Sequence, residues 1–299
     1  MSDLQAHQGN AGQCYLFSYF VGNGEDGLHL SYSEDGYTWH ALNGGHSYLA
    51  PTIGTEKLMR DPSILRGPDG TFHMVWTASW DDTLIGYASS TDLIHWSAQR
   101  GLPVMAETPG VRNCWAPELA YDEKRGEFLI LWASTIKDRF AHTLGQAGTY
   151  NHRMYATTTR DFITFAPPHV FFDPGHIVID ATLFAANVRH YMVYKDETET
   201  PEAQKNLRLA SSDDVRGPYA DISAPFSPPY WVEGPSVLQV GDHYMLYFDA
   251  YTRHHYGALR SRDLETWEDV TDKVSFPRGT RHGTAFTAPR GVLETLLCH

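Results

Sequence analysis

The sequence predicts an all-β protein, a five-bladed β-propeller in which a C-terminal strand completes the N-terminal blade and closes the ring. Three observations predict this fold: a turn motif that occurs five times, a strand-like run upstream of each turn, and a strand that is missing before the first repeat but present after the last. Repeats of this kind are typical of propellers, whose blades are four-stranded sheets around a central channel.

The turn motif has a Ser or Thr at the end of a strand, an Asp two residues later, and an aromatic residue that begins the next strand. Ser, Thr and Asp side chains can accept hydrogen bonds from nearby backbone N–H groups and so hold a tight turn. The fourth copy carries one extra residue. The five copies are Ser33–Trp39, Ser90–Trp96, Thr159–Phe165, Ser212–Tyr219 and Ser261–Trp267.

Runs rich in aromatic and β-branched residues precede each turn, as expected of strands. They are Tyr15–Phe20, Phe72–Thr77, Phe128–Trp132, Tyr191–Tyr194 and Tyr244–Phe248. A further strand-like element stands before four of these runs, at Arg60–Ile64, Trp115–Leu119, Ile179–Leu183 and Glu233–Val237. No window shows helical periodicity over more than a turn or two, so we expect no longer helix.

The two ends of the repeat region predict how the ring closes. The first repeat begins at Tyr15 without the further element, and a matching segment, Arg281–Thr287, follows the last repeat. Pairing these segments would complete the first blade and remove an open sheet edge. An open β-sandwich leaves both features unexplained. We therefore expect residues 1–299 to form a single domain, with residues 1–13 as a flexible N-terminus.

Composition and charge exclude several classes of partner. The chain has 23 Lys and Arg against 36 Asp and Glu, a net charge of -13, whereas nucleic-acid binding depends on cationic side chains. No segment approaches the roughly 18 apolar residues of a membrane helix, and no signal peptide is visible. We expect a cytoplasmic protein without nucleic-acid or membrane partners. The three cysteines (Cys14, Cys114 and Cys298) are too far apart to indicate a disulfide framework or a structural zinc site.

Charged residues gather where the inner strands begin. In a propeller the inner strand of each blade lines the central channel, and alignment of the strand starts places five residues near one funnel: Asp61, Ala116, Asp180, Glu233 and His282. Carboxylates clustered in a partly buried funnel repel one another and lose solvation, so stability does not account for them. Three carboxylates suit hydrolysis of a glycosidic bond, which needs a base, an acid and a means of raising the pKa of the acid.

The motifs that carry these residues resemble glycoside hydrolase family 43, the five-bladed arabinosidase and xylosidase propellers. They are RDPSI at 60–64, WAPEL at 115–119, IDATLF at 179–184 and EGPSV at 233–237. The opening YLFSYFVGNGEDG and the closing RHGT are similar to a branch with α-L-arabinofuranosidase and β-D-galactofuranosidase members. The resemblance implies an exo-acting, inverting hydrolase that removes terminal pentose or furanose residues from an oligosaccharide or glycoside by single displacement with water. α-L-Arabinofuranoside is the first choice of substrate, before β-D-galactofuranoside and β-xyloside.

The resemblance also implies roles for individual residues. Asp61 would be the general base, Asp180 the residue that modulates the pKa of the acid, and Glu233 the general acid. Ala181 stands where the family more often has Pro. His282 resembles an axial histidine that holds a water or a calcium ion, and the chemistry itself would need no cofactor. Glu118 is left out of the catalytic set because strand alternation does not fix its direction.

Five further residues are candidates for contact with the sugar or the acids. Trp115 and Trp80 could stack on a sugar ring at the mouth of the funnel, or pack between blades. Asn113 and Lys195 could donate hydrogen bonds to sugar hydroxyls, or serve the structure. Arg281 is the candidate cationic neighbour of the acids.

Two other functions remain open from the sequence. A propeller lectin would bind sugar in the same funnel without cutting it, but it has no need for an acid opposite a base. A retaining enzyme would need two carboxylates about 5 Å apart rather than the roughly 6.5–9.5 Å of an inverting enzyme. Oligomeric state is not indicated.

Overall fold

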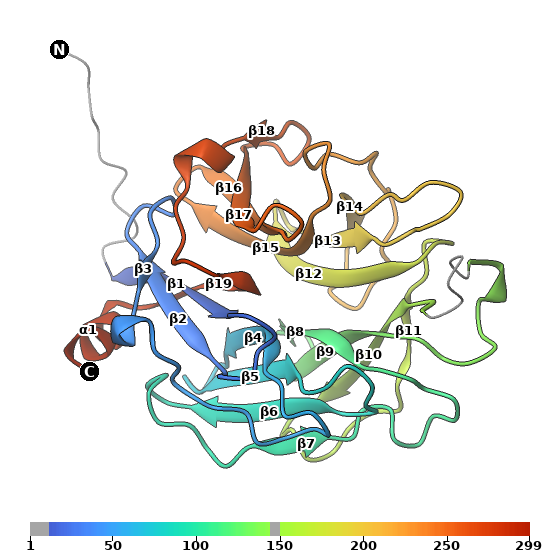
Figure 1. The fold of residues 1–299 in the computed structure, drawn as a ribbon, viewed down its shortest axis with the longest axis horizontal. Coiled ribbons are helices and arrows are strands. Elements are labelled where there is room, and N and C mark those ends of the chain that lie inside the picture. Colours follow the sequence, from blue (N-terminus) through green and yellow to red (C-terminus); the bar gives the residue numbers. More distant parts are fainter. Residues whose placement is uncertain (1–11, 144–149) are drawn as a thin grey trace.

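Five antiparallel sheets surround a central axis in the computed structural model, which describes residues 12–143 and 150–299 (Figure 1). The five-bladed β-propeller predicted from the repeats is confirmed. The expected flexible N-terminus lies outside the described residues except for its last two positions, of which Gln13 begins a strand. No helix in the described ranges is long and apolar enough to span a membrane.

Each blade is numbered from its place in the ring, and its strands are given from the axis outward. Blade 1 is β19 (Arg281–Pro289), β1 (Gln13–Phe20), β2 (His29–Ser33) and β3 (His40–Ala41). Blade 2 is β4 (Arg60–Arg66), β5 (Phe72–Thr77), β6 (Ile85–Ser90) and β7 (Arg100–Leu102). Blade 3 is β8 (Trp115–Asp122), β9 (Glu127–Ser134), β10 (Arg153–Thr159) and β11 (His169–Phe172).

Blades 4 and 5 complete the ring. Blade 4 is β12 (Val178–Ala186), β13 (Arg189–Asp196) and β14 (Asn206–Ser212). A bridge between Ser211 and Ala220 stands where its expected fourth strand would pair. Blade 5 is β15 (Glu233–Val240), β16 (His243–Ala250), β17 (His255–Ser261) and β18 (Glu268–Asp269). The five inner strands contact one another around the axis. Short 3-10 turns, η1 (Asn43–Gly45), η2 (Ala141–Thr143) and η3 (Thr271–Lys273), lie outside the sheets.

Ring closure occurs in blade 1, as the sequence predicts. β1 lies between β19 and β2, with Tyr15 opposite Thr287 on one side and opposite Ser33 on the other. Segments from the two ends of the propeller thus share one sheet (Figure 1). β1 therefore has no open edge.

The turn motif forms the predicted side-chain hydrogen bonds. In blade 2, Ser90 Oγ accepts the backbone N–H of Leu93 at 2.8 Å, and Asp92 Oδ1 accepts those of Ile94 and His95 at 2.9 and 2.8 Å. Leu93 adopts a left-handed φ of 65° with its side chain buried. Blades 1, 3 and 5 repeat this network, while blade 4, with its extra residue, keeps only part of it.

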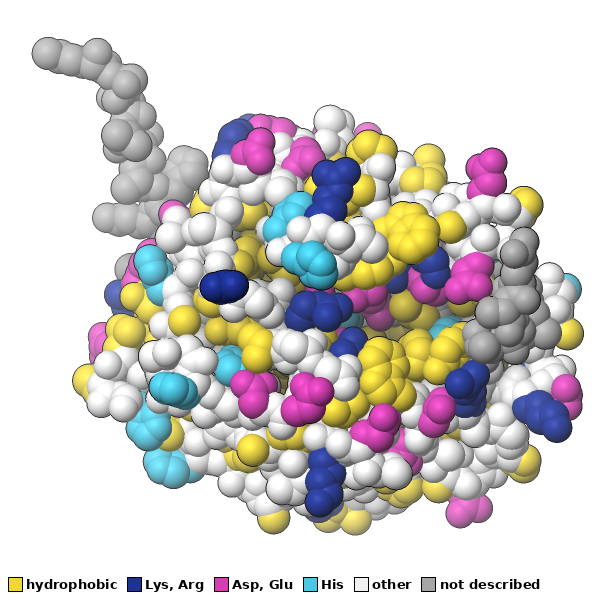
Figure 2. All heavy atoms as spheres, viewed as in Figure 1, with side chains coloured by type: hydrophobic (Ala, Val, Ile, Leu, Met, Phe, Trp, Pro, Cys, Tyr) yellow, Lys and Arg dark blue, Asp and Glu magenta, His cyan; other side chains and the backbone are white. Residues whose placement is uncertain are grey.

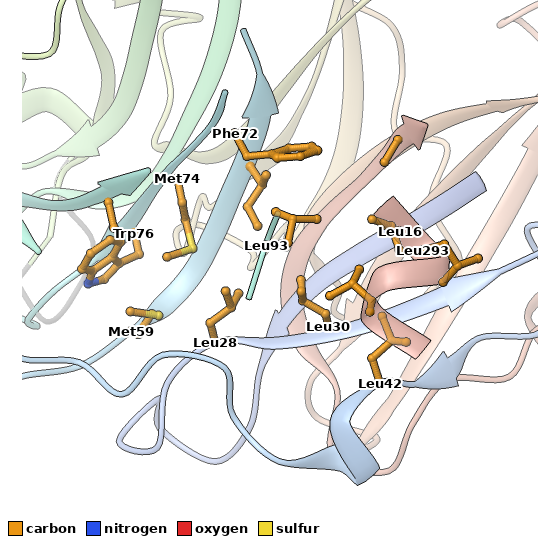
Figure 3. Packing of buried hydrophobic residues seen from close by; sticks show 14 of the residues in the cluster. Leu16, Leu28, Leu30, Leu42, Met59, Phe72, Met74, Trp76, Leu93 and Leu293 are labelled. Atoms are coloured by element: carbon orange, nitrogen blue, oxygen red, sulfur yellow. The ribbon is translucent and has the colours of Figure 1, made fainter. Parts of the chain in front are cut away.

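A nine-residue helix, α1 (Arg290–Cys298), follows the last strand. We expected no helix beyond a turn or two, and this expectation is wrong for the C-terminal residues. Leu293 and Leu296 of α1 are buried in the hydrophobic cluster that contains Leu16 and Leu30, where Figure 3 shows Leu293 beside Leu16. The helix buries only two leucines, three residues apart, so it is too short for a helical hydrophobic period to be recognised in the sequence.

Candidate active site

Every inner strand carries a register shift within its first few residues. In four of them the bulged residue has a left-handed φ: 52° at Asp61, 44° at Ala116, 53° at Asp180 and 57° at Gly234. A bulge leaves one residue unpaired and redirects its side chain. Left-handed backbone at a residue other than glycine costs about 1–3 kcal/mol, and such residues cluster in tight turns and at functional sites. The repeated bulge thus gives the fold a common device for turning side chains toward the axis.

The acid motif of blade 5 is offset by one residue from the others. Glu233 pairs with Asp249 as Arg60 pairs with Thr77, so Gly234, and not Glu233, occupies the position equivalent to Asp61. The sequence alignment that placed Glu233 level with Asp61 is therefore corrected by one position. Only glycine fits at 234, because a Cβ there would lie 2.4 Å from Cγ of His282.

Asp61 is held as an ionised carboxylate. Thr77 Oγ1 donates to Asp61 Oδ2 at 2.8 Å, and His282 Nδ1 lies 3.3 Å from Oδ1. Burial would raise the pKa of Asp61, but the hydrogen bond and charge of His282, with Arg60 and Thr77, outweigh it and lower the pKa to about 2. An ionised carboxylate with fixed orientation is what a general base requires.

Asp180 experiences the opposite balance. Its Oδ2 accepts the backbone N–H of Gly234 at 3.0 Å and lies 3.8 Å from His282 Nδ1. Burial, with repulsion from Glu233 and Asp61, raises the pKa of Asp180 to about 6. The same carboxylates outweigh the desolvation of His282 and raise its pKa to about 9, so His282 is a cation between Asp61 and Asp180.

Glu233 lies between two cations. Lys195 Nζ is 3.1 Å from Oε2, and Arg281 Nη2 is 3.1 Å from Oε1. Arg281 also contacts Asp249 through its Nε at 2.5 Å. Burial would raise the pKa of Glu233, but the charges of Lys195 and Arg281 outweigh it and lower the pKa. The three carboxylates of the funnel therefore have three different electrostatic environments.

Comparison with known proteins decides the family. A family model for family-43-related sequences, described as "Probable glycosyl hydrolase domain", matches residues 10–290. The chain belongs to the family-43-related glycosyl hydrolases. The resemblance drawn from the four motifs is thereby confirmed.

Individual relatives of this glycosyl hydrolase are distant. An α-L-arabinofuranosidase of Bifidobacterium longum subsp. longum is 24% identical over 184 residues, which are 54% of this chain but only 17% of that enzyme. The structure of an α-L-arabinofuranosidase from Lactobacillus brevis has a TM-score of 0.55 at 22% identity, covering 71% of this chain and 72% of that one. A thermostable family-43 glycoside hydrolase has a TM-score of 0.59 at 16% identity, covering 75% and 78%. These two structures share the fold.

The site has three further polar residues: Thr77 and Asp249, which the sequence did not single out, and Glu118, whose direction it left open. Thr77 and Asp249 stand, like the predicted Lys195, on the second strand of a blade, directly opposite the residue that precedes the bulge. Each of these positions follows an apolar run and ends it with a polar side chain. That change of character is the sequence signal that could have found Thr77 and Asp249.

Glu118 is the third of these residues. Ser63 Oγ donates to its Oε2 at 2.9 Å and Thr182 Oγ1 to its Oε1 at 2.8 Å, so the carboxyl group joins blades 2, 3 and 4. The bulge beginning at Ala116 resets the strand alternation and places Glu118 between β4 and β12. Burial raises the pKa of Glu118 to about 7, against the hydrogen bonds from Thr182 and Ser63 that lower it.

Glu118→Gln should make the folding stability of this glycosyl hydrolase less sensitive to pH. The folded state holds the Glu118 proton more tightly than the unfolded chain, so stability falls as the pH rises from about 4.5 through about 7. Glutamine resembles the protonated form and removes this loss. We expect the unfolding free energy of Glu118→Gln, relative to the parent, to rise by about 3 kcal/mol between pH 4 and pH 8 in urea titrations. A difference independent of pH would contradict the assignment of a carboxyl whose pKa is raised in the folded state.

Aromatic side chains stand at the rim of the funnel. Trp80 is 36% exposed, and its ring meets that of Trp115 edge-on, with centroids 5.4 Å apart. The Trp115 indole donates to the carbonyl oxygen of Trp80 at 2.7 Å. The guanidinium of Arg60 lies 4.4 Å from the centroid of Trp80. Trp80 and Trp115 thus form one fixed aromatic corner with an exposed face.

Asn113 lies away from the solvent-accessible surface of the funnel. It is fully buried, its Nδ2 contacts His152 Nε2 at 2.9 Å, and its Oδ1 accepts the backbone N–H of Thr135 at 3.1 Å. A side chain so engaged holds the loop beneath Trp115, whose ring lies 4.7 Å from that of His152. Contact with a sugar would require this loop to rearrange.

The chain has a hollow at the centre of the face shown in Figure 2, where acidic, basic and hydrophobic side chains meet. A cavity of about 500 Å³ adjoins Asp249 and Arg281 and extends past Tyr251 and His255. This volume is in the usual range of small-molecule sites. It provides space beside Arg281, the direct partner of Glu233.

The protein groups around His282 supply few of the oxygen ligands that a calcium ion takes. Calcium prefers six to eight oxygen ligands, and the Nδ1 of His282 already faces Asp61 and Asp180 as a cation. Within residues 12–143 and 150–299, no group of three His, Cys, Asp or Glu side chains could hold a metal ion. No step of the chemistry below passes through a metal.

Proposed function

We propose that this glycosyl hydrolase is an exo-acting, inverting enzyme that removes a terminal pentose or furanose residue from an oligosaccharide or glycoside, with α-L-arabinofuranosides as the first substrates to test. The observation that carries the proposal is the funnel in which Asp61, Asp180 and Glu233 meet in three different electrostatic environments. The named α-L-arabinofuranosidases among its relatives support the choice of sugar.

The proposed reaction is a single displacement. Asp61, oriented by Thr77 and His282, accepts a proton from a water molecule as the water oxygen bonds to the anomeric carbon. The bond from that carbon to the leaving oxygen breaks in the same step, and Glu233 gives its proton to that oxygen. The corner of Trp80 and Trp115 offers a stacking face for a sugar ring.

Glu233 needs a proton for this role, although its two cations favour the ionised form. We assign that proton to Glu233 and Asp180 together. Carboxylates that repel each other titrate as a pair, and the one with the raised pKa holds the proton first. Asp180 and Glu233 therefore share a proton whose pKa is raised by burial and by their mutual repulsion, and this proton lies on Glu233 when the glycosidic bond breaks.

The test is hydrolysis of 4-nitrophenyl α-L-arabinofuranoside, β-D-galactofuranoside and β-D-xylopyranoside, with Asp61→Asn as the control. Release of nitrophenol by the parent and its loss in the variant would establish the hydrolase and name the sugar. The first-formed anomer, followed by proton NMR, should be inverted, and a retained anomer would contradict the single displacement. The same rates after dialysis against EDTA are expected if no metal takes part.

Failure on all three glycosides would turn the test to longer chains. Arabino- and xylo-oligosaccharides would then be incubated with the protein and their products separated by chromatography. Binding of these chains without any cleavage would replace the hydrolase with a sugar-binding propeller, the alternative that the sequence left open.

A further inference from the structure

A series of side chains with alternating charges, called the charge series here, connects Lys205 in blade 4 with the proposed general acid. Each member contacts the next, and each opposes it in sign. In order, the members of this charge series are Lys205, Glu197, Lys195, Glu233, Arg281 and Asp249. The described reaction uses Glu233 and its two immediate cations, and leaves Glu197 and Lys205 without a role.

Lys195 is the member of the charge series that contacts both Glu197 and Glu233. Its side chain is only 2% exposed, and its Nζ lies 2.7 Å from Glu197 Oε2 and 3.1 Å from Glu233 Oε2. The ammonium also lies 4.7 Å from the centroid of the Tyr251 ring. A buried cation divided between two carboxylates attracts each of them less than it would attract one alone. The position of Lys195 along this line therefore decides how strongly it attracts Glu233.

Glu197 is itself fixed by a second buried lysine. Lys205, with a side chain 8% exposed, pairs with Glu197 Oε1, the oxygen not used by Lys195. The backbone holds both ends in place: the N–H of Glu197 donates to Ile177 at 2.9 Å, and the carbonyl of Lys205 accepts from Val232, next to Glu233, at 3.1 Å. Breaking such an ion pair would leave an uncompensated charge away from water, so the arrangement is well determined.

We propose that Glu197 and Lys205 are positioning residues that divide the ammonium of Lys195 between two carboxylates and so control how readily Glu233 takes up a proton. The proposal rests on the proposed function only in naming Glu233 as the acid. Glu197 draws Lys195 away from Glu233, and Lys205 limits that pull by neutralising Glu197. The two residues therefore act on Glu233 in opposite directions.

Other ionisable groups also surround Glu233, and none of these residues is substituted in the test. They come from every element packed against it: Asp180 on β12, Lys195 on β13, Asp249 on β16, Tyr251 after β16, Tyr256 on β17, and Arg281 and His282 on β19. A shift produced by Glu197 or Lys205 is therefore measured against a constant background.

The test compares Glu197→Gln and Lys205→Met with the parent. Titration of the 13C-labelled glutamate carboxyl groups by NMR reports Glu233 directly, and its resonance is assigned by its loss in Glu233→Gln. Glu197→Gln leaves Lys195 to Glu233 alone and should lower the pKa of Glu233 by about one unit. Lys205→Met frees Glu197 to attract Lys195 and should raise that pKa by about half a unit.

Glu199→Gln is the matched control. The Glu199 carboxylate lies 3.6 Å from Lys205 Nζ, and its side chain is 45% exposed. The Glu199→Gln substitution changes the net charge by the same amount as Glu197→Gln. We expect no measurable shift in the Glu233 titration. A shift equal to that of Glu197→Gln would overturn the proposal, because it would show a general effect of charge and not a positioned lysine. Shifts of the same sign in Glu197→Gln and Lys205→Met would also overturn it.

Two further measurements keep the test decisive. The Glu197→Gln/Lys205→Met double variant leaves no unpaired charge between them, so it should fold even if a single variant does not, and it should lower the pKa of Glu233. On any glycoside that the parent hydrolyses, the alkaline limb of kcat/KM should move with each NMR shift while KM changes less than twofold. The NMR arm needs no substrate, so failure of the proposed function and failure of this inference are separable.

Discussion

Replacing Asp61 by Asn is expected to lower kcat/KM on the best glycoside by about 1,000-fold or more, because the amide cannot accept the proton of the attacking water. Asp61 is an ionised carboxylate, with its pKa lowered to about 2, and Thr77 fixes its orientation. The loss should fall mainly on kcat, since the acid and the aromatic corner remain in place. Steady-state kinetics on the parent and the variant measure it.

A control for this prediction is Asp69→Asn, which changes an exposed carboxylate in the turn between β4 and β5. That variant should keep the parental kcat and melting temperature. Asp61→Asn should also fold, as judged by circular dichroism, because asparagine can still accept a hydrogen bond from Thr77. Parental activity in folded Asp61→Asn would remove Asp61 from the role of base.

Replacing Glu233 by Gln is expected to have a large effect that depends on the leaving group. Departure of a sugar alkoxide needs a proton, so the variant should lose about 1,000-fold or more on an oligosaccharide. A nitrophenolate is stable without a proton, so the loss on nitrophenyl glycosides should be at least ten times smaller. Rates on both substrate types, measured with the same protein, give the ratio.

A loss of equal size on both substrate types would contradict the role of Glu233 as the acid. It would show that Gln disturbs Lys195 and Arg281, both 3.1 Å from the carboxylate, and with them the whole site. Asp249→Asn is the comparison, because Asp249 contacts Arg281 but is not the proposed donor. Its effect should be the same for both leaving groups.

The architecture was predictable because it repeats. The Ser–Asp turn, as at Ser90 and Asp92, depends on local hydrogen bonds that the sequence specifies wherever it occurs. Ring closure followed from counting strands at the two ends. Helix α1 was not predictable, because its formation depends on the pocket that Leu16 and Leu30 provide for Leu293, and that pocket exists only after β1 and β2 have paired.

The candidate site was predictable in part, and the bulges set the limit. The motifs located Asp61, Asp180 and Glu233, because acids are rare at the start of apolar strands. The offset of Glu233 and the direction of Glu118 both depend on where the extra residue of each bulge falls. Strand alternation holds only on one side of a bulge, so the pattern alone could not place these two residues.

Because β19 closes the ring, the candidate site can be assembled only after β19 has been synthesised. Arg281 and His282, which between them contact all three carboxylates of the funnel, are carried by β19, which is synthesised after the other described strands of the propeller. Nascent chains that stop short of residue 281 lack both cations and expose the edge of β1, where they can pair with other chains. The centre therefore acquires Arg281 and His282 only when β19 is added, and a chain interrupted before residue 281 lacks the cations that these two residues place beside Asp61, Asp180 and Glu233.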